Sequence, residues 1–115
     1  MKKYEFTGET KEFSGVILRR IKLIRDIKGF KKGDIGGWIE KEENLSHYGD
    51  ALVCDNAMVY GNALIRDNAM VYGNALVCDN VWVYDNAMVY DSARVYGDVL
   101  IYGDNRVCGD CRVFA

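Results

Sequence analysis

The sequence contains no proline, one histidine and no long apolar run. No apolar stretch approaches the roughly 20 residues that a membrane-spanning helix needs. The first residues, MKKYEFTGETKEF, are charged throughout and lack the apolar segment of a signal peptide. We therefore expect a cytoplasmic protein with no membrane partner, in which the four cysteines are thiols rather than disulfides.

Strong net charge of either sign is also missing. The formal net charge is −2, which argues against nucleic acid as a partner. This average hides an asymmetry. Residues 1–48 hold 11 Lys and Arg against eight Asp and Glu, whereas residues 49–115 hold four Arg against nine Asp. The second part contains no Lys, Glu, His, Thr or Gln, so the two parts differ in kind.

A six-residue repeat fills residues 49–114. Position 5 of the hexad is always Val or Ile, position 3 is small in most copies, and positions 1 and 2 are Gly, Asp, Asn or Ser. Positions 3 and 5 share one face of a strand, and the residues at positions 1 and 2 suit tight corners. Each hexad is therefore predicted to be a four-residue strand and a two-residue corner. The eleven copies read GDALVC, DNAMVY, GNALIR, DNAMVY, GNALVC, DNVWVY, DNAMVY, DSARVY, GDVLIY, GDNRVC and GDCRVF.

Six residues cannot repeat as hairpins with the same inward pattern, because the chain would reverse at each step. A coil with three equal sides satisfies the pattern. Three hexads give 18 residues per coil, and eleven hexads give about 3.7 coils. We therefore predict an all-β, parallel β-helix over 49–115. Each Val should lie over the Val three hexads earlier, and corner Asn side chains should form hydrogen-bonded ladders.

Residues 1–48 lack the repeat and are predicted to form a small β-rich cap, since an open coil end exposes unpaired strand edges. Residues 15–27 are compatible with a helix or a strand, and their β-branched residues and initial Gly favour the strand. Residues 8–12 read as a polar connection and residues 33–40 as a loop feeding a short strand. Alternatively, the basic residues of this part form a binding surface with neighbouring aromatics. The residues best placed to close the coil end are Trp38, Ile39 and Leu45.

The pattern V-x-[GD]-[ND]-A-x, and VCDNVWVYDNA in particular, resembles the hexapeptide repeat of left-handed parallel β-helices over 66 of 115 residues. The resemblance implies the left-handed sense, because parallel crossovers are otherwise almost always right-handed. The segment KKGDIGGWIEKEENLSHYGDA is similar to the lead-in of a group of bacterial and prophage hexapeptide proteins, some of which are labelled transferases. This similarity implies a phage or prophage setting.

Few residues suit catalysis or metal binding. Hexapeptide acyltransferases use a His base near a subunit boundary, and His47 is the single candidate here. We expect His47 to be structural, which leaves an acyltransferase-like enzyme as the alternative reading. Cys108 and Cys111 have CxxC spacing, but hexad positions 6 and 3 point to opposite sides, which argues against a redox or zinc site. The position-1 Asp residues read as solvated turns, so we expect no metal and no cofactor.

Positions 4 and 6 point outward and fall into three columns. A monomer does not normally display contiguous columns of Leu, Met, Trp and Tyr, so we expect a homo-oligomer, either dimer or trimer. In the alternative, the cap folds down over one column. The predicted interface consists of Leu52, Leu64, Met70, Tyr72, Trp82, Tyr84, Met88, Tyr90, Leu100 and Tyr102. The predicted surface for a ligand or partner consists of Arg66, Arg94, Arg106, Arg112 and His47.

Together these observations predict a non-catalytic, oligomeric binding or scaffold protein. It would engage a host macromolecule, or it would hold a small nucleotide-like ligand in clefts between subunits, which suits a counter-defence role in a phage.

Overall fold

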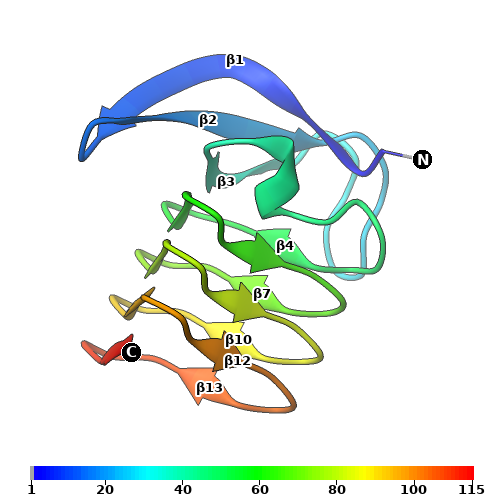
Figure 1. Cartoon of the computed structure of the whole chain (residues 1–115). Coiled ribbons are helices and arrows are strands. Elements are labelled where there is room, and N and C mark those ends of the chain that lie inside the picture. Colours follow the sequence, from blue (N-terminus) through cyan, green and yellow to red (C-terminus); the bar gives the residue numbers. More distant parts are fainter. Residues whose placement is uncertain (1) are drawn as a thin grey trace.

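The computed structural model describes residues 2–115 and shows a three-sided solenoid with an antiparallel hairpin across one end (Figure 1). The hairpin consists of β1 (Tyr4–Phe13) and β2 (Val16–Leu23), and β3 (Ile35–Ile39) and a 3-10 turn, η1 (Glu42–Asn44), lead into the repeat. Residues 2–115 contain no helix long and apolar enough to cross a membrane. The repeat strands are β4 (Leu52–Val53), β5 (Met58–Val59), β6 (Leu64–Ile65), β7 (Met70–Val71), β8 (Leu76–Val77), β9 (Trp82–Val83), β10 (Met88–Val89), β11 (Arg94–Tyr96), β12 (Leu100–Ile101), β13 (Arg106–Val107) and β14 (Arg112–Phe114).

The repeat strands form three parallel faces, as predicted. The first face is β4, β7, β10 and β13, the second is β5, β8, β11 and β14, and the third is β6, β9 and β12. Residues pair with those 18 positions later, as Val59 does with Val77 and Ile65 with Val83. The period of three hexads per coil is therefore confirmed, and with it the all-β parallel solenoid. The left-handed sense stays a prediction from the resemblance.

The corners explain why the repeat needs Gly or Asp at position 1. All eleven position-1 residues have positive φ, for example Asp55 at 59° and Gly73 at 69°. Glycine adopts this conformation freely and Asp tolerates it. Each position-1 Asp carboxylate also accepts the backbone N–H one coil below, for example Asp55 from Gly73 at 3.0 Å. These carboxylates therefore hold coils together.

The predicted Asn ladders are present at position 2. Asn56 donates to Asn74, Asn62 to Asn80, and Asn68 to Asn86, at 3.2–3.4 Å. Inside the tube, the Val of position 5 and the Ala of position 3 are almost fully buried in the first three coils. Burial of each Val side chain contributes about 1.5–3 kcal/mol as an upper estimate. The interior therefore stabilises the rod and the corners fix its register.

The cap continues the second face of the solenoid. β1 pairs antiparallel with β2, β2 antiparallel with β3, and β3 in parallel with β5. The parallel stack therefore begins at β3, upstream of the predicted division between residues 48 and 49. The expectation of a polar connection over residues 8–12 is wrong. These residues lie within β1, where Gly8, with φ of 97°, falls at an irregularity of the register between Phe6 and Thr10. A hairpin with one solvated side tolerates such polar residues.

The three predicted cap residues are buried, in two different settings. Ile39 pairs with Val59 and Leu45 with Ile65. Both therefore occupy inward positions of the uppermost coil, which is the coil next to the hairpin and one coil before β5 and β6. Trp38 pairs with Met58 and takes an outward position, where Lys11 and Arg20 lie over its ring. The core continues above this coil into side chains of the hairpin, namely Tyr4, Ile21 and Leu23.

Candidate interaction face

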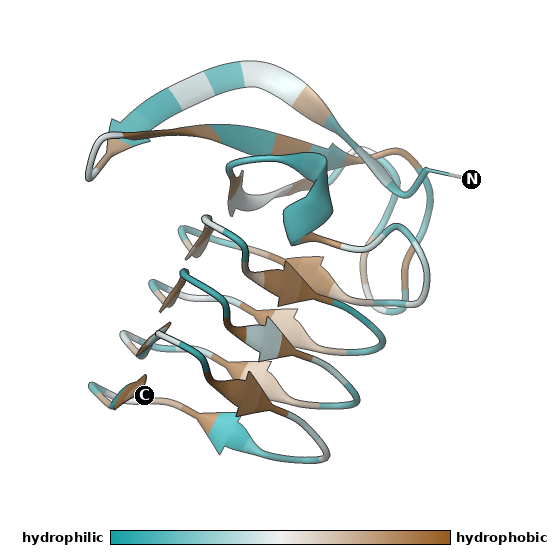
Figure 2. Ribbon diagram, in the orientation of Figure 1, coloured by the Kyte–Doolittle hydropathy of each residue, from teal (hydrophilic) through white to brown (hydrophobic). Residues whose placement is uncertain are grey.

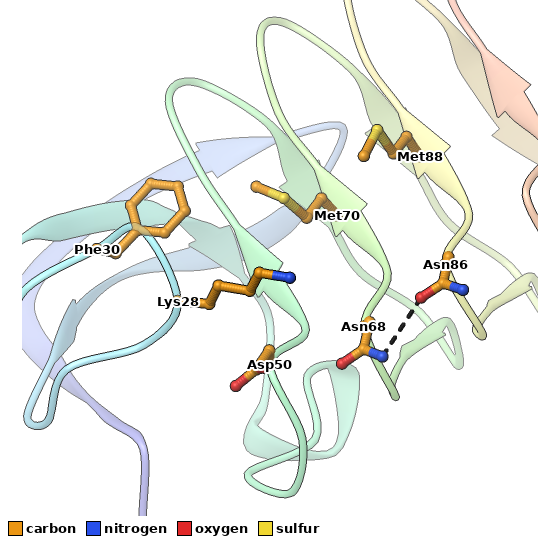
Figure 3. A pocket seen from close by; sticks show the side chains of 7 residues that line it. All are labelled: Lys28, Phe30, Asp50, Asn68, Met70, Asn86 and Met88. Atoms are coloured by element: carbon orange, nitrogen blue, oxygen red, sulfur yellow. Dashed lines mark hydrogen bonds between the residues drawn. The ribbon is translucent and has the colours of Figure 1, made fainter.

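The three faces differ in how far the cap covers them. On the first face, Leu52 is only 2% exposed, in contrast to the half-buried Met70 and Met88 below it. A groove of about 340 Å³ runs between the 26–31 loop and this face (Figure 3). Lys28 and Phe30 form the loop side, and the two Met side chains come from β7 and β10. Figure 2 shows that the hydropathy of the residues on this face changes from hydrophobic at β4 to hydrophilic at β13, the strand that begins at Arg106.

On the second face, the tip of the hairpin overhangs the upper coils. The Phe13 ring packs edge-on against Tyr60, with centroids 6.2 Å apart. Leu76 and Cys78, in the next coil, are buried. A cavity of about 270 Å³ lies below the tip and extends to Arg112.

The third face is the most exposed apolar surface of the repeat. Trp82 is 41% exposed, Leu100 54% and Tyr102 50%. Arg66 lies over the rings of Trp82 and Tyr84, at 5.3 and 4.8 Å from their centroids. Tyr84 in turn stacks on Tyr102 at 5.7 Å. The face is thus a preformed column of flat groups with one cation at its upper end.

The ten residues predicted for an interface divide between two faces. Leu52, Met70, Tyr72, Met88 and Tyr90 lie on the first face, where Tyr72 and Tyr90 stack at 5.0 Å. The other five share the third face. They are Leu64, Trp82, Tyr84, Leu100 and Tyr102.

The predicted ligand or partner residues are not brought together. Arg66 belongs to the third face and Arg106 to the first, whereas Arg94 and Arg112 are direct neighbours on the second. His47 lies in the cap, where its ring stacks on Tyr4 at 4.1 Å. The five residues therefore belong to four separate environments.

His47 is held by structural contacts. Its Nδ1 accepts the backbone N–H of Lys3 at 3.0 Å, and its Nε2 lies 3.7 Å from a Glu42 carboxylate oxygen. Burial lowers the pKa of His47, and Glu42 partly opposes this effect. The nitrogen that would accept a proton in general-base catalysis is already occupied by a backbone donor. This geometry fits the structural role expected for His47.

The residues around His47 were not predicted from the sequence. Lys3 is fully buried and its ammonium donates to the Ala51 carbonyl oxygen. The Tyr4 hydroxyl donates to the carbonyl oxygen of Leu45 at 2.6 Å, and burial raises the pKa of Tyr4. The apolar–polar alternation at the start of the chain indicates a strand, but it does not show which partner that strand takes.

The other candidate sites bring no metal ligands together. Residues 2–115 contain no group of three or more His, Cys, Asp or Glu side chains placed to hold a metal ion. Cys108 and Cys111 are both free thiols, the first half-buried and the second exposed.

The comparisons with known proteins agree with the fold. The family profile described as YdcK Beta solenoid repeat matches residues 51–67 and 81–97. No curated protein matches the chain. The two matched segments cover β4 to β6 and β9 to β11, hence parts of all three faces. By its hexad repeat, its parallel stack and this match, the chain is a repeat β-solenoid protein.

Proposed function

We propose that the protein is a non-catalytic scaffold that self-associates through its third face. The observation that carries the proposal is the contiguous exposure of Trp82, Leu100 and Tyr102 on one face of parallel strands. Aromatic and aliphatic side chains on a rigid face suit an interface core, because little conformational entropy is lost when they are covered.

The charges on this face favour a two-fold, antiparallel pair over a parallel trimer. Arg66 lies at the upper end of the face, whereas Asp98 and Asp104 lie at the corners on either side of β12. A two-fold axis through the β9 row brings Arg66 of one copy to the acidic end of the other. A parallel three-fold arrangement would instead hold three Arg66 side chains at one height.

The size of the face sets the expected strength. Three strands at a spacing of about 4.8 Å give a contact that is smaller than the roughly 800 Å² per partner of a standard interface. We therefore expect a dimer with a dissociation constant in the micromolar range rather than an obligate assembly.

Sedimentation velocity over a concentration series tests the proposal. The wild type should change from a 13.0 kDa monomer to a dimer as its concentration rises. Leu100→Arg should remain monomeric, because the two-fold arrangement would bring the new guanidinium close to Arg66 of the other copy, and two buried like charges repel. Ile17→Arg is the matched control, since Ile17 is 50% exposed on the hairpin, away from the third face, and it should dimerise normally. A wild type that stays monomeric at high micromolar concentration would refute the proposal.

The biological setting is part of the same proposal. The similarity of residues 31–51 to prophage hexapeptide proteins supports a phage or prophage scaffold in the cytoplasm, whose uncovered faces engage a host macromolecule. The acyltransferase-like alternative depends on His47, and the backbone donor on Nδ1 weighs against it. A His47→Ala protein that folds but loses all biological effect, with self-association intact, would favour that alternative.

A further inference from the structure

Aromatic side chains at hexad position 6 form stacked columns along the rod. Wherever two of these rings occupy successive coils of one face, they stack, as Tyr72 does on Tyr90 and Tyr96 on Phe114, at 5.0 and 5.1 Å. The second face breaks this order. Its position-6 residues run Tyr60, Cys78, Tyr96 and Phe114, so a small thiol stands where a ring would fit.

The missing ring coincides with the cavity of the second face. The cavity has a volume of about 270 Å³ and is lined by Tyr60, Cys78 and Tyr96, with Phe13 of the hairpin at its upper end. Tyr60 and Tyr96 are two coils apart, hence about 10 Å along the rod at normal strand spacing. A planar ring at the level of Cys78 would then lie at stacking distance from each of them.

Two guanidinium groups lie beside this gap. Arg94 and Arg112 occupy position 4 of adjacent coils, pair directly in the parallel register and line the same cavity. Like charges placed side by side on a sheet repel one another. Among residues 2–115, neither has a carboxylate oxygen within ion-pair distance. The position-1 carboxylates at the corners flanking this face are engaged by the backbone, Asp79 by Gly97 and Asp91 by Gly109.

We propose that this cavity of the second face binds a nucleoside monophosphate, with the base between Tyr60 and Tyr96 and the phosphate on Arg94 and Arg112. Arginine recognises phosphate oxygens in a bidentate manner, and bases stack on aromatic side chains without strict sequence preference. The ligand thereby fills the interrupted ring column and neutralises the arginine pair. A purely apolar ligand would leave the two charges uncompensated, and inorganic phosphate would leave the gap empty.

A titration followed by amide NMR tests the proposal with three probes, which are AMP, adenosine and inorganic phosphate. AMP should shift the resonances of residues around Cys78 and Arg94, and it should bind at least about tenfold more tightly than either fragment. Equal affinity for AMP and inorganic phosphate, or no shifts with AMP at millimolar concentration, would overturn the proposal.

Two variants separate the two halves of the site. Cys78→Phe completes the ring column, so it should abolish AMP binding while weak phosphate binding persists. Arg94→Gln should weaken AMP binding at least about tenfold, because it removes a charge-assisted contact. Arg106→Gln is the matched control, since Arg106 has the same hexad position on the first face and is exposed. If Arg106→Gln weakens binding as much as Arg94→Gln does, AMP responds only to general positive charge and the proposed site is wrong.

The cavity lies on the second face and the proposed interface on the third. The proposal of AMP binding and the proposal of self-association can therefore be tested independently. The titration is repeated in the Leu100→Arg protein. Undiminished AMP binding there would support a site complete within one chain, and loss of binding in that folded variant would contradict it.

Discussion

The cap and the repeat differ in how they satisfy the hydrogen bonds of their polar groups. In the repeat, the fully buried side chains are apolar, and the side-chain hydrogen bonds between coils form corner ladders that recur every 18 residues. In the cap, Lys3 and Asn44 are buried and each is satisfied individually. Asn44 uses its side chain for four bonds, accepting from Glu40 and Lys41 and donating to Gly61 and Ala63.

This difference separates the positions that the fold requires from the positions that it leaves free to vary. The first coil must end the stack, so it cannot take its hydrogen bonds from a coil above, and unique side chains replace the ladder. The outward side chains of the repeat do not have to supply such hydrogen bonds. Substitutions in the cap should therefore affect folding, whereas substitutions on the outer faces should affect association and binding.

The largest expected difference in the free energy of unfolding is between two leucine-to-alanine substitutions, one in the cap and one on an outer face of the repeat. Leu45→Ala removes a fully buried side chain from the uppermost coil and should lower the free energy of unfolding by about 2–5 kcal/mol. Leu100→Ala removes a side chain that is 54% exposed and should cost no more than about 0.5 kcal/mol, while it weakens self-association. Urea denaturation measures both. Similar losses for the two variants would mean that cap and repeat do not differ as described.

A smaller effect concerns pH and the buried Lys3. Burial, aided by Arg25 and opposed by Asp50, lowers the pKa of Lys3 from its usual 10.5 to about 8. Between these values the unfolded chain binds more protons at Lys3 than the folded chain does, so this residue adds stability as the pH rises. Below pH 8, Lys3 is charged in both the folded and the unfolded chain, so the full cost of burying its charge lowers the stability of the folded chain.

Lys3→Met removes that titration. The stability of the wild type relative to Lys3→Met should therefore increase between pH 8 and 10.5, by up to about 3 kcal/mol. Tyr4 and Cys54, whose pKa values are raised by burial, act in the opposite direction but are common to both proteins. Denaturation of the two proteins across this pH range provides the measurement, and parallel stability curves would contradict it.

The smallest expected difference in stability is between glycine-to-alanine substitutions at a corner next to the cap and at a corner near the far end of the solenoid. Gly49 and Gly109 have similar φ, 72° and 65°, so alanine should strain both by about 1–2 kcal/mol. A Cβ at Gly49 would lie 2.6 Å from the Asp67 carbonyl oxygen, whereas one at Gly109 meets nothing within 4 Å. Thermal unfolding should therefore show Gly49→Ala to be less stable than Gly109→Ala by about 1 kcal/mol or more.

The sequence alone predicted the repeat region in detail. The period of 18 residues, the inward Val and Ala, the Asn ladders and the composition of each face follow from eleven similar hexads, because every hexad repeats the same local requirement. Regular repetition turns a local pattern into a three-dimensional register.

Only the tertiary structure decided the features that occur once. The length of β1, the outward position of Trp38, the burial of Lys3 and the overhang of Phe13 on Tyr60 depend on how a single hairpin packs on the coil. The repeat also did not show which face stays exposed or where a gap opens between Tyr60 and Tyr96. Such features arise from long-range contacts between unlike segments, and no local periodicity encodes them.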